Sequence, residues 1–314
     1  MGLAFRRSRP LRPVTVDLRV GTRRSALALA QAEWVRARIE SSHRTARVDL
    51  VPLVTSGDRN RRDARRDDFT DAIDSALLRR DVDIAVHSAK DLPSEGRAGL
   101  VVAAYPRRED PRDCLVVRGE ESLRALPRGA RVGSSSARRR AQLLRRRPDL
   151  DVVELRGNVD TRIERVRESQ LDGVVLAYAG LRRLNRQAEA RQVFTTRQML
   201  PAPAQGALAV ATRRQDRTTT HLLRPLDDPA TRACVTAERA FVASMGGDCT
   251  VPLAAYADLR HSELLLRAEV YSRDGATRLA VALGAAPGNP RALGNRAARE
   301  LKRRGATSLW TEMG

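Results

Sequence analysis

The chain has 314 residues, of which 42% are hydrophobic, enough for two or three domain cores and too many for wholesale disorder. No apolar run approaches the roughly 18–20 residues of a membrane span, so we expect no membrane partner. A net charge of +20 favours anionic partners. Because only 3% of the residues are aromatic and no zinc-ligand spacing occurs, we expect neither a nucleic-acid partner nor a bound metal.

The basic start of the chain and its cysteines bear on the compartment. Residues 1–16 contain no acidic residue and lack the apolar stretch of a secretory signal, so we expect a disordered basic tail. Cys114, Cys234 and Cys249 form an odd, widely spaced set, which argues against a disulfide framework and fits a cytoplasmic protein. We expect at least two of them to be small buried apolar residues.

A repeated plan organises the first two thirds of the chain. Residues 18–28, LRVGTRRSALA, and residues 130–143, ARVGSSSARRRAQL, each predict a strand, a glycine turn with hydroxyl and arginine side chains, and a helix. After the first copy, apolar residues recur at helical spacing at Leu27, Ala30, Trp34 and Ala37. Further strands are predicted in each copy at 48–58 and 81–93, and at 150–160 and 171–184. Strands that alternate with helices indicate parallel, doubly wound α/β lobes.

The chain is predicted to cross between the two lobes twice. Residues 105–113 leave the first lobe and residues 200–213 return to it, which permits a hinge. The layout resembles the periplasmic binding-protein architecture, with a ligand cleft at the carboxyl ends of the strands. The predicted boundaries are 17–106 with 203–224 for lobe 1, 107–202 for lobe 2, and 225–314 for a small α+β C-terminal domain.

Caps and turns predict the elements of the C-terminal domain. Asp228 and Pro229 are typical of a helix start, and Gly246–Gly247 of its end. The apolar stripe of this helix consists of Ala233, Ala237, Ala240 and Phe241. Strands at 251–259, 263–272 and 277–285 follow, with a hairpin turn at Asp274–Gly275 and a final helix from about 290 to 304.

Lys90 and Asp91 end a predicted buried strand in the segment HSAKDLP, residues 87–93. Lys90 is notable because only two of the 58 basic residues are lysine. A functional interpretation makes Asp91 a general acid–base group and Lys90 a carboxylate ligand. A capping Asp beside a solvated Lys explains the position equally well.

Arginine and hydroxyl side chains gather at the other predicted strand ends. GSSSARRR (133–140) and GTRRS (21–25) each open a helix, where backbone N–H groups and hydroxyls bind anions. One such copy is ordinary capping, whereas two copies that face one cleft favour an anion site for carboxylate or phosphate. So many cations in one cleft favour a ligand with several negative charges. The candidates are Arg23, Ser25, Ser136, Arg138, Arg139, Arg156, Arg162 and Arg183.

Cys249 lies in the glycine-rich loop MGGDCTVP, outside any predicted strand. A thiol in such a loop is accessible to ligands and is able to bear a covalent adduct. By base rate alone, a structural cysteine is the more frequent explanation.

Together these segments resemble the porphobilinogen deaminase (hydroxymethylbilane synthase) family over about residues 18–310. The matching segments, in the family's order and spacing, are GTRRSALALAQA, VTSGD, DIAVHSAKDLP, REDPRD, VGSSSARRR, ELRGNVDTR, LAYAGLRRL, PAPAQGALAV, TAERAF and GGDCTVP. The resemblance implies a transferase of porphyrin and haem biosynthesis that is cytoplasmic and monomeric. Such enzymes join four porphobilinogen units with loss of ammonia, and water then releases the linear tetrapyrrole.

The resemblance also implies roles for the candidate residues. The catalytic aspartate falls on Asp91, and a dipyrromethane cofactor is held by a thioether bond to Cys249. Positions that hold the cofactor's carboxylates fall on Lys90, Ser136, Arg138, Arg139, Arg162 and Arg183. Positions that bind the incoming substrate fall on Arg23, Ser25 and Arg156. The acetate and propionate of each pyrrole make the expected ligand a small polycarboxylate.

One segment departs from the family pattern. The family has a longer loop with glycine and lysine after the VTSGD strand, whereas this chain reads RNRRDARRDDFTDAIDSALL at 59–78. Arg65 or Arg66 is expected to replace a ligand-binding lysine in this possible lid. The alternatives to an active deaminase are therefore a lid-impaired paralogue and a non-catalytic, two-lobed protein that binds small anions.

Overall fold

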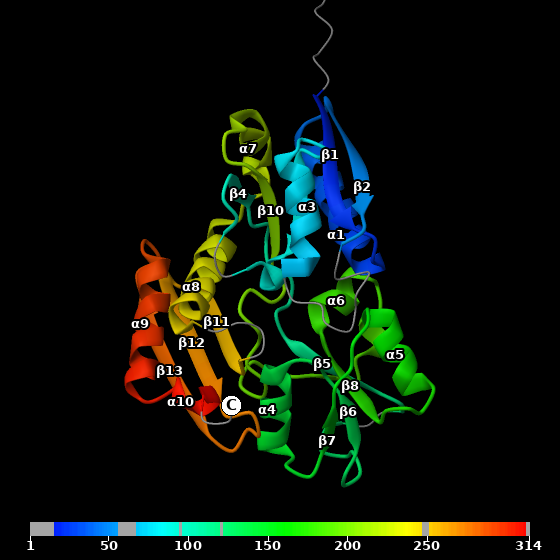
Figure 1. Ribbon diagram of the computed structural model, residues 1–314, viewed down its shortest axis with the longest axis vertical. Helices are drawn as coiled ribbons and strands as arrows, with labels where there is room; N and C mark the ends of the chain where they lie inside the picture. Colours follow the sequence, from blue (N-terminus) through cyan, green and yellow to red (C-terminus); the bar gives the residue numbers. More distant parts are fainter. Residues whose placement is uncertain (1–15, 56–66, 94–95, 120–121, 247–250, 312–314) are drawn as a thin grey trace, which may run out of the picture.

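The computed structural model describes residues 16–55, 67–93, 96–119, 122–246 and 251–311, which form three β-sheets with flanking helices (Figure 1). Each lobe contains one five-stranded sheet, and the C-terminal domain contains a three-stranded sheet. The predicted fold class is confirmed: two doubly wound α/β lobes and a small α+β domain. Most of the predicted tail, residues 1–15, lies outside the described residues.

Lobe 1 is a mixed sheet with strand order β2-β1-β3-β10-β4, in which β1 is parallel to β2 and β3. Its strands are β1 (Val16–Arg23), β2 (Ala46–Leu53), β3 (Ile84–Ser88), β4 (Leu100–Ala104) and β10 (Leu208–Arg213). Its helices are α1 (Ala26–Ser42), α3 (Asp67–Leu78) and α7 (Arg217–Leu223). Successive strand residues alternate between the two faces. Ile84 therefore packs in the core beside α1, and Ala85 in the core beside α3.

Lobe 2 repeats this topology with strand order β7-β6-β8-β5-β9, in which β6 is parallel to β7 and β8. Its strands are β5 (Asp113–Val117), β6 (Arg131–Gly133), β7 (Asp151–Val153), β8 (Gly173–Ala177) and β9 (Gln192–Val193). Its helices are α4 (Ala137–Arg146), α5 (Val159–Arg167) and α6 (Tyr178–Arg183). Val174 packs in the core beside α5, and Val175 in the core beside α4.

Two details of the lobes differ from the expectation. The fourth strand of each sheet, β10 or β5, is antiparallel to both neighbours, because each arrives from the other lobe through a crossover. Helix α1 forms as predicted, but its buried face is shifted by about one residue from the proposed stripe. Trp34 is 38% exposed, and the fully buried apolar positions are Ala32, Val35 and Ile39.

The two crossover segments touch each other at Gly206. The backbone N–H of Glu109 donates to the carbonyl of Gly206 over 3.1 Å. Gly206 has φ +87°, and a Cβ at this position would lie 2.3 Å from the carbonyl oxygen of Glu109. Only glycine allows both this backbone conformation and this close approach.

The C-terminal domain packs two helices against one face of a meander. Its elements are α8 (Pro229–Met245), β11 (Leu253–Arg260), β12 (Glu263–Tyr271), β13 (Arg278–Ala285), α9 (Pro290–Arg303) and α10 (Ser308–Thr311). The predicted caps are confirmed: the Asp228 side chain accepts from Thr231 N, and Gly246, at φ +71°, ends α8. In Figure 1 the upper end of α8 lies near lobe 1, and α4 lies near the β11–β12 side of the domain.

Candidate active site

Lys90 and Asp91 lie directly after β3, in a single 3-10 turn (Ala89–Asp91). Four of the five β3 residues are buried, so the strand holds this turn firmly in the sheet. The N–H of Ala89 donates to the carbonyl of Ala207 over 3.0 Å. Arg239 of α8 donates to the carbonyls of Ala89, Leu92 and Pro93. The return crossover and the C-terminal domain therefore both fix the turn.

Within the described residues, neither Lys90 nor Asp91 forms a hydrogen bond through its side chain. Burial, the largest cause, lowers the pKa of Lys90 to about 8. The charges of Arg139 and Arg138 also lower this pKa, and the carboxylates of Asp91 and Asp113 oppose the decrease. Lys90 is thus a partly exposed cation that forms no ion pair with any residue of the described ranges.

In each lobe a serine side chain caps the N-terminus of the first helix. The hydroxyl of Ser25 accepts from Ala28 N at the start of α1, and the hydroxyl of Ser136 accepts from Arg139 N at the start of α4. Both serines are partly exposed and follow the carboxyl ends of β1 and β6, where the sequence predicted an anion site. Arg23 is the last residue of β1 and is also partly exposed.

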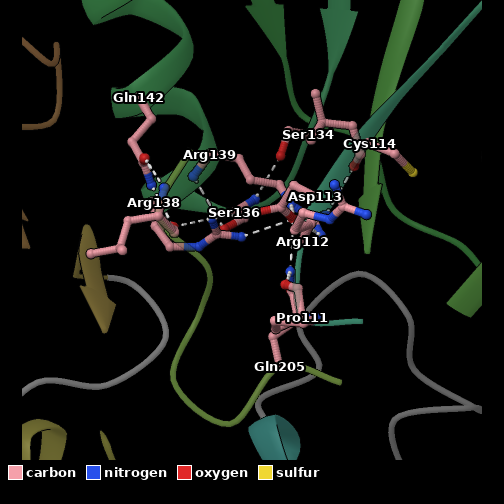
Figure 2. A network of polar contacts seen from close by, with 12 residues as sticks. Pro111, Arg112, Asp113, Cys114, Ser134, Ser136, Arg138, Arg139, Gln142 and Gln205 are labelled. Carbon is pink, nitrogen blue, oxygen red and sulfur yellow. Dashed lines mark hydrogen bonds and ion pairs between the residues drawn. The ribbon is translucent and has the colours of Figure 1, made fainter. Parts of the chain in front are cut away.

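Arg138 and Arg139 both contact one buried carboxylate, Asp113, as Figure 2 shows. Arg138 Nη1 lies 2.7 Å from Asp113 Oδ2, and Arg139 Nε lies 2.9 Å from Oδ1. The exposed fractions are 4% for Arg138, 6% for Arg139 and 0% for Asp113. Burial alone would raise the pKa of Asp113, but the two guanidinium charges hold it far below its usual range. The sequence predicted that these arginines bind a ligand carboxylate, and in the structure both already bind a carboxylate of the chain itself, Asp113.

Three further arginines were predicted at strand ends of lobe 2. Arg162 donates from Nε to the carbonyl of Gly157 over 2.9 Å, and Arg183 donates from Nη2 to the carbonyl of Gly206 over 2.8 Å. Burial, the largest cause, lowers the pKa of each to about 10. Arg156 differs because it is exposed and pairs with Glu154 over 2.8 Å.

Charged side chains of the two lobes act on each other. Lys90 of lobe 1 is within electrostatic reach of Arg138, Arg139 and Asp113 of lobe 2. Arg162 of lobe 2 is likewise within reach of Asp91. The structure therefore brings Asp91, Lys90, Arg138, Arg139 and Arg162 into one site.

The described residues fit a ligand with several carboxylates. Buried cations are costly unless counter-charges offset them. Among the described residues, the carboxylates of Asp91 and Asp113 act on the charges of Lys90, Arg138 and Arg162. The Nε–H of Arg138 is buried and has no hydrogen-bond partner. An incoming carboxylate would reduce the excess positive charge.

Three predicted site residues cannot be placed, because Arg65, Arg66 and Cys249 lie outside the described residues. The other two cysteines, Cys114 and Cys234, are buried free thiols, as expected for structural cysteines. No helix in the described ranges is long and apolar enough to cross a membrane.

Sequence reasoning missed three residues of this site. Asp113 was read only as part of the crossover, and Gln205, which donates to Asp113 Oδ1 over 3.1 Å, only as part of the return segment. Arg239 was placed in a helix without a role. Each acts on residues far away in the sequence, so no local spacing identifies it. The one available signal was an acidic residue that starts a fully buried strand, DCLVV.

Comparison with known proteins identifies two matching family models. Residues 18–221 match the porphobilinogen deaminase dipyrromethane cofactor-binding domain, and residues 232–303 match the porphobilinogen deaminase C-terminal domain.

Curated relatives match along most of the chain. A porphobilinogen deaminase of Syntrophotalea carbinolica is 44% identical over 93% of this chain and 94% of its own length. The Rubrobacter xylanophilus protein of the same name is 46% identical over 92% of this chain and 95% of its own length. Among solved structures, a putative methionine-binding lipoprotein of Bacillus subtilis matches with a TM-score of 0.41 and 14% identity, over 67% of this chain and 89% of that one.

Proposed function

Because the chain belongs to the porphobilinogen deaminase family, whose members are hydroxymethylbilane synthases that work on a dipyrromethane cofactor, we propose the residues with which it carries out this reaction. Asp91 is the catalytic residue, and Cys249 carries the cofactor. The observation that supports the assignment best is the cluster of buried and partly buried cations near Asp91, whose charge is only partly balanced by carboxylates of the described residues.

The cations of the cleft hold the carboxylates of the pyrrole chain. The cofactor lies against side chains from both lobes, namely Lys90, Ser136, Arg138, Arg139, Arg162 and Arg183. Arg23, Ser25 and Arg156 receive the acetate and propionate of the incoming porphobilinogen. Because each pyrrole adds two negative charges, a guanidinium, which offers forked donors to a carboxylate, suits this ligand.

Asp91 acts on the pyrrole that reacts. Loss of ammonia from porphobilinogen leaves a cationic pyrrole, and a carboxylate held in a low-dielectric site stabilises such a cation and accepts its protons. The fixed turn after β3 keeps Asp91 in place, and its carboxylate lies within electrostatic reach of Lys90 and Arg162.

The dipyrromethane supplies the primer to which new pyrrole units are added. Cys249 lies three residues beyond Gly246, where α8 ends, and α8 also holds the Lys90–Asp91 turn through Arg239. A thiol in that loop is therefore tethered by the same helix that fixes the catalytic turn.

The experiment that tests this proposal measures the intact mass of the purified protein and its product from porphobilinogen. We expect the wild type to carry a covalent dipyrromethane, and Cys249→Ser to have the mass of the bare polypeptide. Cys234→Ala, which changes a buried thiol on α8, is the matched control and should keep the adduct. A wild-type mass without any adduct contradicts the assignment of Cys249.

Asp91→Ala tests the catalytic role. We expect it to fold and to lose about 10²- to 10⁴-fold in bilane formation, the usual contribution of a positioned acid–base group. Undiminished turnover by this variant contradicts the role of Asp91. A protein that takes up labelled porphobilinogen without making bilane supports the alternative of a small-anion binding protein or a lid-impaired paralogue.

Several further features complete the proposal. Arg65 or Arg66 acts as the ligand-binding cation of the possible lid. The enzyme works as a monomer, because the proposed site is built from a single chain, and the free thiols of Cys114 and Cys234 suit the cytoplasm. Its domains have the boundaries predicted from the sequence, and neither nucleic acid nor membrane is a partner. Light scattering at assay concentration tests the oligomeric state.

A further inference from the structure

Asp113 bonds two neighbouring arginines of one helix at the same time. Successive residues of an α-helix point about 100° apart, so Arg138 and Arg139 have no intrinsic reason to converge. They converge because Asp113, the first residue of β5, offers Oδ2 to Arg138 at 2.7 Å and Oδ1 to Arg139 at 2.8 Å. Backbone carbonyls complete the arrangement, since Arg138 also donates to Leu200 O and Arg139 to Val175 O.

The carboxylate is itself anchored from the other crossover. Gln205 precedes β10 on the return segment and is fully buried. Its Nε2 donates to Asp113 Oδ1 over 3.1 Å and to the carbonyl of Pro111 over 2.7 Å. Arg108 in turn donates to the carbonyl of Gln205 over 2.7 Å. Asp113 is therefore held at the point where both crossovers enter the site, as Figure 2 shows for Pro111 and Gln205.

The bonding to Asp113 leaves specific donors for a ligand. Asp113 cancels one of the two guanidinium charges, so the three groups together keep a single positive charge. The Nε–H of Arg138 remains buried without a partner. Lys90 lies within electrostatic reach of all three groups.

We propose that Asp113 is a positioning residue for the polycarboxylate pyrrole chain: it holds Arg138 and Arg139 side by side and cancels one of their charges, so that their remaining N–H donors and Lys90 meet carboxylates at a fixed place. Asp113 does not touch the substrate and acts through the two arginines. The inference rests on the proposed function, because it assumes that the cleft holds the pyrrole chain.

The experiment compares two variants of Asp113 with a matched control. Asp113→Glu keeps the charge and moves the carboxylate by one methylene, whereas Asp113→Asn removes the charge. Asp83→Asn is the control, because Asp83 also pairs with two arginines, Arg19 and Arg213, but precedes β3 and lies at the opposite end of that strand from Asp91.

For Asp113→Glu we expect KM for porphobilinogen to rise about tenfold while kcat changes less than about threefold, since a displacement near 1 Å disturbs binding geometry strongly. For Asp83→Asn we expect lower thermal stability and an unchanged KM. A wild-type KM in Asp113→Glu overturns the inference. If Asp113→Asn fails to fold, Asp113→Glu decides the question alone.

A second measurement does not depend on the activity of the loaded enzyme. Apoenzyme from cells unable to make porphobilinogen is incubated with porphobilinogen, and cofactor loading is followed by intact mass from about pH 6 to pH 10. Asp113 raises the pKa of Lys90, so Asp113→Asn should lose loading at a lower pH than the wild type. Asp113→Glu and Asp83→Asn should lose cofactor loading at the same alkaline pH as the wild type.

The outcomes separate this inference from the proposed function. Wild-type protein that loads cofactor and makes bilane supports the proposed function whatever the variants do. If Asp113→Asn then loses cofactor loading at the same alkaline pH as Asp83→Asn, Asp113 only forms a structural ion pair and the inference fails. If the wild type neither loads nor makes bilane, the proposed function fails first.

Discussion

Lys90 is one of two lysines in a chain with 58 basic residues, and its environment gives the lysine a consequence that arginine would not have. Burial brings the pKa of Lys90 to about 8, whereas a guanidinium stays protonated across the physiological range. As pH rises through about 8, Lys90 loses its charge and with it the attraction for a carboxylate. Cofactor loading by the apoenzyme should therefore decline on the alkaline side.

Lys90→Arg tests this dependence. We expect the variant to load cofactor to a higher pH than the wild type, even if loading near pH 7 is slower because the larger side chain fits less well. Lys302→Arg is the control, since Lys302 is exposed on α9 and should leave the profile unchanged. If Lys90→Arg and the wild type lose cofactor loading at the same alkaline pH, another group is responsible for the pH dependence.

At the residue scale, the sequence predicts well what depends on neighbours in the chain. Ser25 and Ser136 were predicted at helix starts, and both cap their helices. Lys90 and Asp91 were predicted at a strand end, and both lie directly after β3. The bonding of Arg138 to Asp113 spans 25 positions and depends on how β5 pairs in the sheet, so no local pattern indicates it.

At the element scale, the contact between the crossovers depends on Gly206. An alanine there would combine a strained φ with a Cβ 2.3 Å from the carbonyl of Glu109, so the segments would have to separate. We expect Gly206→Ala to lower the free energy of unfolding by more than the roughly 1 kcal/mol that a left-handed φ alone costs a non-glycine residue. Urea unfolding measures this, and a raised KM should accompany it, because Arg183 donates to the Gly206 carbonyl.

Gly129→Ala separates conformational strain from steric overlap. Gly129 has φ +75°, close to that of Gly206, but nothing lies within 4 Å of the Cβ that alanine would add. We expect this control to show the cost of φ alone and a wild-type KM. Equal losses in the two variants would mean that the crossovers tolerate the added methyl group.

The elements also show where sequence patterns stop being informative. Alternating strands and helices predict parallel strands, and β1, β2 and β3 do pair in parallel. The pattern does not reveal that β10 lies between β3 and β4, because this order depends on a segment that returns from the other lobe. The phase of α1 was also missed, since Ala32, Val35 and Ile39 pack in the core of the lobe while Trp34 is 38% exposed.

At the scale of the whole molecule, the three parts of the chain meet at the fully buried carboxylate of Glu238 on α8. It accepts from Arg108 on the outgoing crossover at 2.6 and 3.0 Å. It also accepts from the N–H of Ala204 on the return segment and from that of Ala257 on β11, the latter over 2.7 Å. One side chain therefore joins both crossovers to the C-terminal domain.

Glu238→Gln should separate this junction from ordinary surface ion pairs. The variant leaves Arg108 buried without a counter-charge and turns an amide NH₂ toward a backbone N–H, so we expect a loss of about 3–5 kcal/mol in the free energy of unfolding. Glu300→Gln on α9 is the control, because its partner Arg303 is 75% exposed and such pairs contribute about 1 kcal/mol or less. Urea unfolding of both variants gives the two losses of free energy.

If the two losses are equal, the attachment of the C-terminal domain must depend on its apolar contacts and not on Glu238. A larger loss in Glu238→Gln, together with earlier proteolytic release of the C-terminal domain, would show that the Glu238 carboxylate holds α8 against the lobes. It would thereby also hold Arg239, which donates to the backbone of the turn that contains Asp91.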